Sequence, residues 1–325
     1  MPRPAYQPKL SIVIPAPTDV SALEDTLVSV LEKKPDDSEV IVALGCAYDD
    51  PWNIGEEVTF VQAPLGSSLV ACVNVGVAAS SAAVTHILAA GWRATADWTE
   101  GPLARFSSPS TVAVVPLTVA ADDHARPVAA GVRCARGGRR IEVAPGRGVA
   151  PAHGPALEAG FWRTEFLRRA GPGFSTACGD SGADADMAVA VARSGGTVVV
   201  DETSRVVAGP ARRRSGAFLA GLHAERLFWR AVAGQSIPWA LIAHGIEVLR
   251  HAVARAPFGT LPMLAGRLVA LLQFGAYLPR YRHLRSLMQE TVPTDDVQTF
   301  RIDEAHGTLP LPKRRTEVAP LRRSA

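Results

Sequence analysis

The sequence predicts an α/β protein with a mostly parallel central sheet, flanking helices and a C-terminal helical tail. Three observations predict this class. Short apolar runs alternate with helical segments from residue 10 to about residue 209, an order typical of strands joined by crossover helices. The runs lack polar alternation, as expected for strands buried on both faces. After residue 210, apolar residues recur at helical spacing and the net charge changes sign.

The first crossover unit spans Leu10–Leu44. Its apolar runs Leu10–Ile14 and Val40–Leu44 predict two buried strands. Between them, Ser21 and Glu24 have the spacing of a capping box, which predicts that a helix begins there. A strand, a helix and a second strand in this order form a right-handed crossover, the first unit of a parallel sheet.

The remaining elements follow in order along the chain. We expect strands at residues 58–62, 84–88, 112–119 and 197–200, helices at 69–80, 161–170 and 184–194, and a hairpin around 131–143. Three further helices are expected at 218–232, 236–253 and 257–278. The predicted domains are a catalytic-type α/β domain at 1–210, a basic helical extension at 211–290 and a disordered tail at 291–325.

The charge of the chain is unevenly distributed. Residues 210–290 contain 11 Arg and 3 Glu, a net charge of +8, whereas residues 1–209 have a net charge of −6. The basic segment predicts an anionic partner, either phosphate or lipid headgroups; a solvated Arg-rich helical face is the alternative. Residues 256–278 are mostly apolar, but Arg267 lies at their centre. We therefore expect an interfacial or partner-packing helix there rather than a spanning one, or packing against the main domain.

Cysteine usage and the N-terminus indicate a cellular compartment. The four cysteines lie far apart without a C-x-x-C spacing, so neither a zinc site nor a disulfide framework is indicated. Reduced thiols are typical of the cytoplasm, and the first nine residues contain no apolar signal segment. We expect a cytoplasmic protein that can associate peripherally with the inner face of the membrane through residues 211–290.

Several stretches resemble motifs of the family 2 glycosyltransferases, which have the GT-A fold. They are ACVNVGVAAS with Asn74 and Gly76, TEFLRRAGPGF at Thr164–Phe174, GADADMAVAVARSGGTVVV from Gly182, and HAERLFWRAV at His223–Val232. Their order and spacing cover about 200 residues. The resemblance implies transfer of a sugar from a nucleotide-diphospho-sugar to a cell-envelope, glycan or lipid-linked acceptor.

The resemblance also implies a set of site residues. Asp184 matches the general base that acts on the acceptor hydroxyl, and the other implied residues are divided between the donor and acceptor sides. The donor side contains Pro15, Thr18, Asn74, Arg93, Arg212, Arg213 and Arg214, and the acceptor side contains Arg163, Asp180 and Asp186. Structural roles remain open for three of them: a helix N-cap for Asp184, a helix-to-loop hydrogen bond for Asn74, and a purely structural carboxylate for Asp186.

The donor side departs from the family pattern. Ala89-Ala90-Gly91 stands where the family has the metal-binding D-x-D, and the second strand ends in Leu44-Gly45 without the expected Asp. We therefore expect no metal cofactor, with Arg212–Arg214 facing the diphosphate of a metal-independent transferase. The alternative is a catalytically inactive GT-A pseudoenzyme that serves as a scaffold or regulatory partner.

Three other function classes are disfavoured by the sequence. The first strand is followed by PAPTD rather than G-x-G-x-x-G, which argues against a nicotinamide-binding Rossmann protein. The chain lacks the G-x-S-x-G elbow of a serine hydrolase. It has a basic segment but no aromatic platform or recognisable module for nucleic acid, so we expect no nucleic-acid partner.

Overall fold

Strand β1 (Leu10–Ala16) lies inside a nine-stranded sheet in the computed structural model, which describes residues 8–146, 151–171, 173–211, 215–233 and 235–290. The strand order is β3-β2-β1-β4-β10-β6-β11-β5, and β7 pairs with β6. The bounds are β2 Ser38–Leu44, β3 Val58–Gln62, β4 Val84–Leu88, β5 Arg93–Ala94, β6 Thr111–Val119, β7 Pro127–Ala129, β10 Ala159–Arg163 and β11 Thr197–Val207. Strands β1 to β4, β6 and β11 run in one direction, so the predicted mostly parallel sheet is confirmed.

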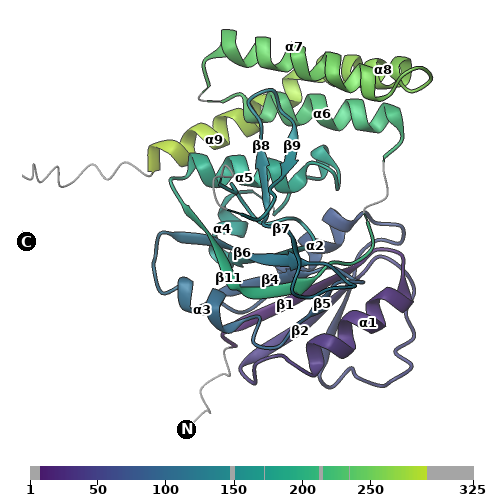
Figure 1. Ribbon diagram of the computed structural model, residues 1–325, viewed down its shortest axis with the longest axis vertical. Coiled ribbons are helices and arrows are strands. Elements are labelled where there is room, and N and C mark those ends of the chain that lie inside the picture. The colour runs from purple at the N-terminus through teal and green to yellow at the C-terminus, as the bar shows by residue number, and fades with distance from the viewer. Residues whose placement is uncertain (1–7, 147–150, 172, 212–214, 234, 291–325) are drawn as a thin grey trace, which may run out of the picture. The chain divides into compact units, whose positions relative to one another are not determined.

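Helices cover both faces of the sheet (Figure 1). Helices α1 (Val20–Leu31) and α3 (Glu100–Arg105) pack on one core, and α2 (Leu69–Ala79), α4 (Thr164–Arg169) and α5 (Ala183–Arg193) pack on the other. A separate hairpin of β8 (Val132–Cys134) and β9 (Arg140–Glu142) confirms the hairpin predicted there. Burial of these two apolar cores supplies the main driving force for folding.

The predicted helix at residues 161–170 is corrected by the structure. Only the second half of this segment is helical, as α4, and the first half belongs to the central strand β10, which is antiparallel to both β4 and β6. Phe161 packs into one core and the next residue, Trp162, into the other. A strand buried on both faces has no polar alternation, so its pattern does not differ from that of a buried helix. Strand β11 is likewise longer than predicted and continues to Val207.

Helix α1 begins at a different cap from the one predicted. Asp19 is the N-cap, and its carboxylate accepts a hydrogen bond from the Ala22 N–H at 3.0 Å. Ser21, the predicted cap, is exposed and lies inside the helix. The predicted N-cap therefore lies two residues after the observed one.

Replacing Asp19 with alanine should lower the free energy of unfolding by about 1 kcal/mol, because one helix N–H then loses its acceptor. The matched control is Ser21→Ala, which removes a hydroxyl from the cap that the sequence predicts. Urea denaturation should show almost no change for this control. Equal losses in the two variants would contradict the observed cap.

Four helices follow the sheet: α6 (Ala217–Ala231), α7 (Ile237–Ala254), α8 (Thr260–Leu272) and, after the 3-10 turn Phe274–Tyr277, α9 (Leu278–Glu290). The predicted helix 257–278 is thus too long, and α9 was not predicted. Helices α6 and α8 approach closely, because Gly221 faces the Met263 carbonyl and Gly266 faces the Phe218 carbonyl. A Cβ at either glycine would overlap the opposite backbone.

Part of the sequence-based organisation stays a prediction. The described residues up to Glu290 belong to one compact unit, so the division at residue 210 is not tested, and the predicted tail 291–325 lies outside the described residues. No single helix among the described residues has the length and apolar character needed to cross a membrane. The pair Thr260–Leu272 and Gly275–Leu287 meets that criterion only when joined, across a 66° bend.

Candidate functional site

A cavity of about 930 Å³ opens at the carboxyl ends of β1 and β4. Its lining includes Pro15 and Thr18, both predicted as donor-side residues, and Ala89 and Ala90, which follow β4. Ligands of open α/β sheets gather at this edge of the sheet. Pro15 and Thr18 therefore lie in one wall of the pocket, and their donor-binding role stays a prediction.

The turn after β4 is fixed in place. The Gly91 N–H donates to the Thr26 hydroxyl and to the Ala22 carbonyl, each at 2.8 Å, and Thr26 also donates to the Trp92 carbonyl at 2.8 Å. Gly91 has a φ of +88°, and a Cβ at this position would press on Pro210. Helix α1 thus holds the Ala89–Gly91 turn in one defined conformation.

A second wall comes from the helical extension and the β8–β9 hairpin. Pocket-lining residues of these parts are Gly137, Gly138, Arg139, Arg140, Leu219, Ala220, His223, Ala224, Leu227, Glu247, Arg250, His251, Arg255 and Arg267. The sequence did not place any of these residues at the site. Only His223, Ala224 and Leu227 lie in a stretch that the sequence singled out as a motif, and the pocket itself exists only after α6, α7 and α8 pack beside the sheet.

The second wall is rich in positive charge. Arg139 and Arg250 both bind Glu247, at 2.9 and 2.6 Å, and Arg267 binds Glu225 at 2.6 Å. Among the described residues, Arg255 donates only to the Ser215 carbonyl, at 3.5 Å, and no carboxylate pairs with it. Arg255 is therefore the arginine of this wall that is best placed to bind an anionic ligand.

His251 adds no charge to this wall near neutral pH. Burial, reinforced by the nearby guanidinium groups of Arg267, Arg255 and Arg250, lowers the pKa of His251 to about 4. Its imidazole is consequently neutral at physiological pH, and its Nδ1 lies 3.2 Å from Arg267 Nη2 as a hydrogen-bond acceptor.

The loop at residues 176–182 forms the third side of the pocket. Asp180 lines the cavity, and its carboxylate accepts hydrogen bonds from the Leu69 and Val70 N–H groups at 3.3 and 2.9 Å. These groups form the N-terminus of α2, where a carboxylate is stabilised by the helix dipole. Of the predicted acceptor-side residues, Asp180 is the one that the structure places in the pocket.

His223 lies beside this loop on α6. A Cβ at Gly179 would overlap the imidazole ring, so the glycine allows the close approach of loop and histidine. The Nδ1 atom is buried and has no hydrogen-bond partner among the described residues. Burial and the charge of Arg226 lower the pKa of His223, against the opposing effect of Asp180. His223 therefore offers the pocket a neutral imidazole that can accept a proton.

Asp184 lies behind the pocket surface rather than in it. The side chain is 0% exposed. Its two carboxylate oxygens share the Arg140 Nε–H, each at 3.0 Å, and one of them also accepts from Arg140 Nη2 at 2.9 Å and from the Leu157 N–H at 3.2 Å. Asp184 thus orients Arg140, which does line the pocket. The general-base role stays a prediction, and the N-cap alternative is wrong because Gly182 is the cap of α5.

Asp186 and Asn74 have structural contacts and do not line the pocket. Asp186 is buried on α5 and binds Arg230 and Arg280, which joins α5 to α6 and α9. Asn74 donates to the Phe174 carbonyl at 2.8 Å and accepts from the Phe174 N–H at 2.7 Å. The helix-to-loop hydrogen bond of Asn74 is confirmed, and its donor-side role stays a prediction.

Arg163 and Arg93 also lie away from the cavity. Arg163 ends β10, opposite Val84 at the amino end of β4, because β10 runs antiparallel. Its guanidinium group donates to the carbonyls of Thr111, Phe106 and Ser108. Arg93 is exposed on β5 and is absent from the pocket lining. Arg212, Arg213 and Arg214 lie outside the described residues.

Comparison with known proteins identifies the fold. No protein-family model matches the sequence, and no curated protein sequence matches it. The structure of GalNAc-T7 with UDP, GalNAc and Mn²⁺ is similar, with a TM-score of 0.57, 15% identity, and coverage of 88% of this chain and 57% of that one. Residues 1–349 of TarS from S. aureus give a TM-score of 0.57, 11% identity, and coverage of 87% and 90%.

A second TarS structure, in complex with UDP, gives the same TM-score of 0.57 at 13% identity, with coverage of 87% and 88%. These likenesses show that the chain has a GT-A-type glycosyltransferase fold. The predicted fold is therefore confirmed, whereas membership of family 2 stays a prediction.

The expectation of a site without a metal cofactor is corrected by the same comparison. GalNAc-T7 has this fold and holds Mn²⁺ together with UDP and GalNAc. In the described part of this chain, no three His, Cys, Asp or Glu side chains are grouped so that they could hold a metal ion. The described residues thus do not form a metal centre by themselves.

Proposed function

We propose that the chain is a family 2-like glycosyltransferase that binds a nucleotide-diphospho-sugar in the 930 Å³ pocket. The acceptor would be a cell-envelope or lipid-linked molecule. The observation that supports this most is the position of the pocket, at the carboxyl ends of β1 and β4 in a GT-A-type fold. Two structures of that fold, GalNAc-T7 and TarS, contain UDP.

Arg255 is proposed as a ligand of the donor diphosphate. It lines the pocket from the extension, and no described carboxylate neutralises it. A guanidinium group can donate two parallel hydrogen bonds to phosphate oxygens, and its charge would stabilise the leaving diphosphate. Arg140, held in position by Asp184, also lines the pocket and would add a second guanidinium group.

His223 is proposed as the group that removes the proton of the acceptor hydroxyl. Its imidazole is neutral, and Asp180 on the facing loop would stabilise the imidazolium that forms. As the acceptor oxygen bonds to the anomeric carbon, the bond from that carbon to the diphosphate breaks, and the hydroxyl proton passes to His223. A positioned base of this kind contributes about 10²–10⁴-fold to a rate.

A scaffold without catalysis is the second candidate function. The sequence feature behind it is the loss of carboxylates at Ala89–Gly91. A scaffold requires neither an open pocket of this size nor a half-buried, neutral histidine on its wall, so these features favour the transferase. The two functions differ in nucleotide binding and in turnover.

Arg255→Gln should weaken binding of UDP or GDP about tenfold or more, the effect of losing a charge-assisted hydrogen bond to phosphate. Isothermal titration with Mn²⁺ and with EDTA measures the affinity and any contribution of the metal. The control is Arg126→Gln, since Arg126 is an exposed arginine that pairs with Asp122 and does not line the pocket.

His223→Gln should keep nucleotide binding but lower turnover at least about 100-fold. If the wild type binds neither nucleotide, the proposed function is wrong. If both nucleotides bind Arg255→Gln as tightly as the wild type, Arg255 is not a phosphate ligand.

A further inference from the structure

An exposed apolar surface covers the outer sides of α7 and α8. On α7, Trp239, Ile242, Ile246, Leu249 and Val253 are 55–69% exposed. Their spacing of three and four residues places them on one side of the helix. We call the apolar side chains on these two helices, together with Phe258 between them, the outer face.

Helix α8 continues the outer face. Leu261 and Leu272 are 77% and 80% exposed, Leu264, Leu268 and Leu271 are also exposed, and Phe258 is 92% exposed. The opposite side of α8, with Met263, Gly266 and Ala270, is buried against α6. Within the described structure no element covers the outer face. Contiguous apolar surface of this extent marks a site of interaction with a partner or a membrane.

The charge around the outer face identifies the kind of partner. From Ile237 to Leu287 the chain contains six arginines and one acidic residue, Glu247, which is already bound to Arg139 and Arg250. Arg267 and Arg280 are neutralised by Glu225 and Asp186. No carboxylate among the described residues pairs with Arg255, Arg282 or Arg285, so these three arginines keep this helical layer positive. A second copy of this chain would bring like charges together, whereas anionic lipid headgroups complement them. Trp239 adds an amphipathic ring of the type enriched at membrane interfaces.

We infer that the outer face of α7 and α8 binds an anionic lipid bilayer, with both helices lying in the interface. The polar sides of α7 and α8, with Arg250, His251 and Arg267, face the protein, which fits interfacial rather than spanning helices. Membrane contact is therefore assigned to a defined surface of the extension.

The pocket would lie next to the membrane in this arrangement. Arg250 and His251 line the cavity from α7, while Leu249 and Val253 of the same helix point to the outer face. The distance between the two sides of a helix is about 10 Å. If the proposed function holds, lipid-linked acceptors would thus reach the pocket from the bilayer surface.

The test is vesicle co-sedimentation of the full chain without nucleotide. The wild type should bind vesicles of phosphatidylcholine mixed with phosphatidylglycerol, bind pure phosphatidylcholine less, and lose affinity at high salt. The variant I242Q/I246Q/L249Q should bind the anionic vesicles at least about tenfold more weakly, because three apolar side chains that would be buried in the bilayer are lost. The control V28Q/W52Q/L65Q removes three equally exposed apolar residues elsewhere and should bind like the wild type.

Circular dichroism and the melting temperature establish that each variant is folded. Absence of vesicle binding by the wild type, or equal binding by I242Q/I246Q/L249Q, overturns the inference. Light scattering that shows a wild-type dimer, lost in the same variant, together with no vesicle binding, would assign the face to a second copy instead. Nucleotide binding should be unchanged in this variant, so failure of the surface and failure of the proposed function give different results.

Discussion

Replacing Asp186 with asparagine is expected to lower the free energy of unfolding by about 3–5 kcal/mol, the cost of leaving buried charges without their partner. The carboxylate accepts hydrogen bonds from Arg230 Nε at 2.8 Å and from Arg280 Nη2 at 2.9 Å. Both guanidinium groups are largely buried, so water cannot replace the lost carboxylate. Because this cluster joins α5 to α6 and α9, its loss should also loosen the extension.

The effect of Asp186→Asn depends on pH. Burial alone would raise the pKa of Asp186, but attraction to Arg280 and Arg230 outweighs it and holds the pKa below its usual value. A carboxyl group with a lowered folded-state pKa adds stability above its unfolded-state pKa of about 4. That stability is lost as the pH falls through the folded-state pKa. The difference in unfolding free energy between wild type and variant, measured by urea denaturation, should therefore be complete at pH 7 and should shrink toward zero in acid.

The matched control for this prediction is Asp122→Asn. Asp122 binds Arg126 at 2.8 Å, but the pair is exposed, so its loss should change the free energy of unfolding little. If Asp186→Asn loses no more unfolding free energy than Asp122→Asn, the buried cluster does not stabilise the packing of α5 against α6 and α9.

The crossover unit shows how much of the fold the sequence determines locally. Strands β1 and β2 are predicted by apolar runs of the kind that a parallel sheet requires, and helix α1 by the segment between them. Strand β10 could not be found in the same way. Its residues Phe161 and Trp162 are both apolar, and only the neighbours β4 and β6 make the segment a strand. The cap of α1 was misplaced because Asp19 and Ser21 both suit an N-cap, and the backbone before the helix decides between them.

The site was predictable only on one side. Pro15, Thr18 and Ala89 lie at strand ends, where the topology alone implies a ligand edge. The opposite wall consists of side chains from α6, α7 and α8, whose packing beside the sheet depends on contacts between segments far apart in sequence. The carboxylates Asp184 and Asp186 match a catalytic motif, yet each is bound to buried or half-buried arginines. A motif identifies residue types but not their partners.

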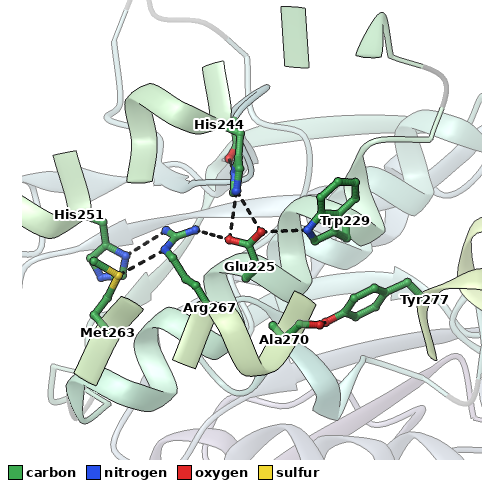
Figure 2. A network of polar contacts seen from close by, with 9 residues as sticks. Glu225, Trp229, His244, His251, Met263, Arg267, Ala270 and Tyr277 are labelled. Carbon is green, nitrogen blue, oxygen red and sulfur yellow. Dashed lines mark hydrogen bonds and ion pairs between the residues drawn. The ribbon is translucent and has the colours of Figure 1, made fainter. Parts of the chain in front are cut away.

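Replacing Glu225 with glutamine is the second substitution with a large expected effect, again about 3–5 kcal/mol of unfolding free energy. Figure 2 shows its carboxylate at the centre of a buried network that joins α6, α7 and α8. It accepts hydrogen bonds from Arg267 Nη1 at 2.6 Å, Trp229 Nε1 at 2.9 Å and His244 Nε2 at 3.0 Å. A glutamine amide would turn its NH₂ group toward these donors and leave the buried Arg267 without a counter-charge.

The double variant E225Q/R267M separates loss of the ion pair from simple loss of packing. Methionine fills much of the volume of the arginine stem without a charge, and buried ion pairs are often replaced by apolar groups at little cost. The double variant should therefore unfold at a urea concentration closer to wild type than E225Q does. Glu32→Gln, at an exposed pair with Lys33, serves as the control and should change the midpoint little. If E225Q is as stable as the control, the network does not hold the extension together, and the pocket wall formed by Arg267 must be fixed by apolar packing alone.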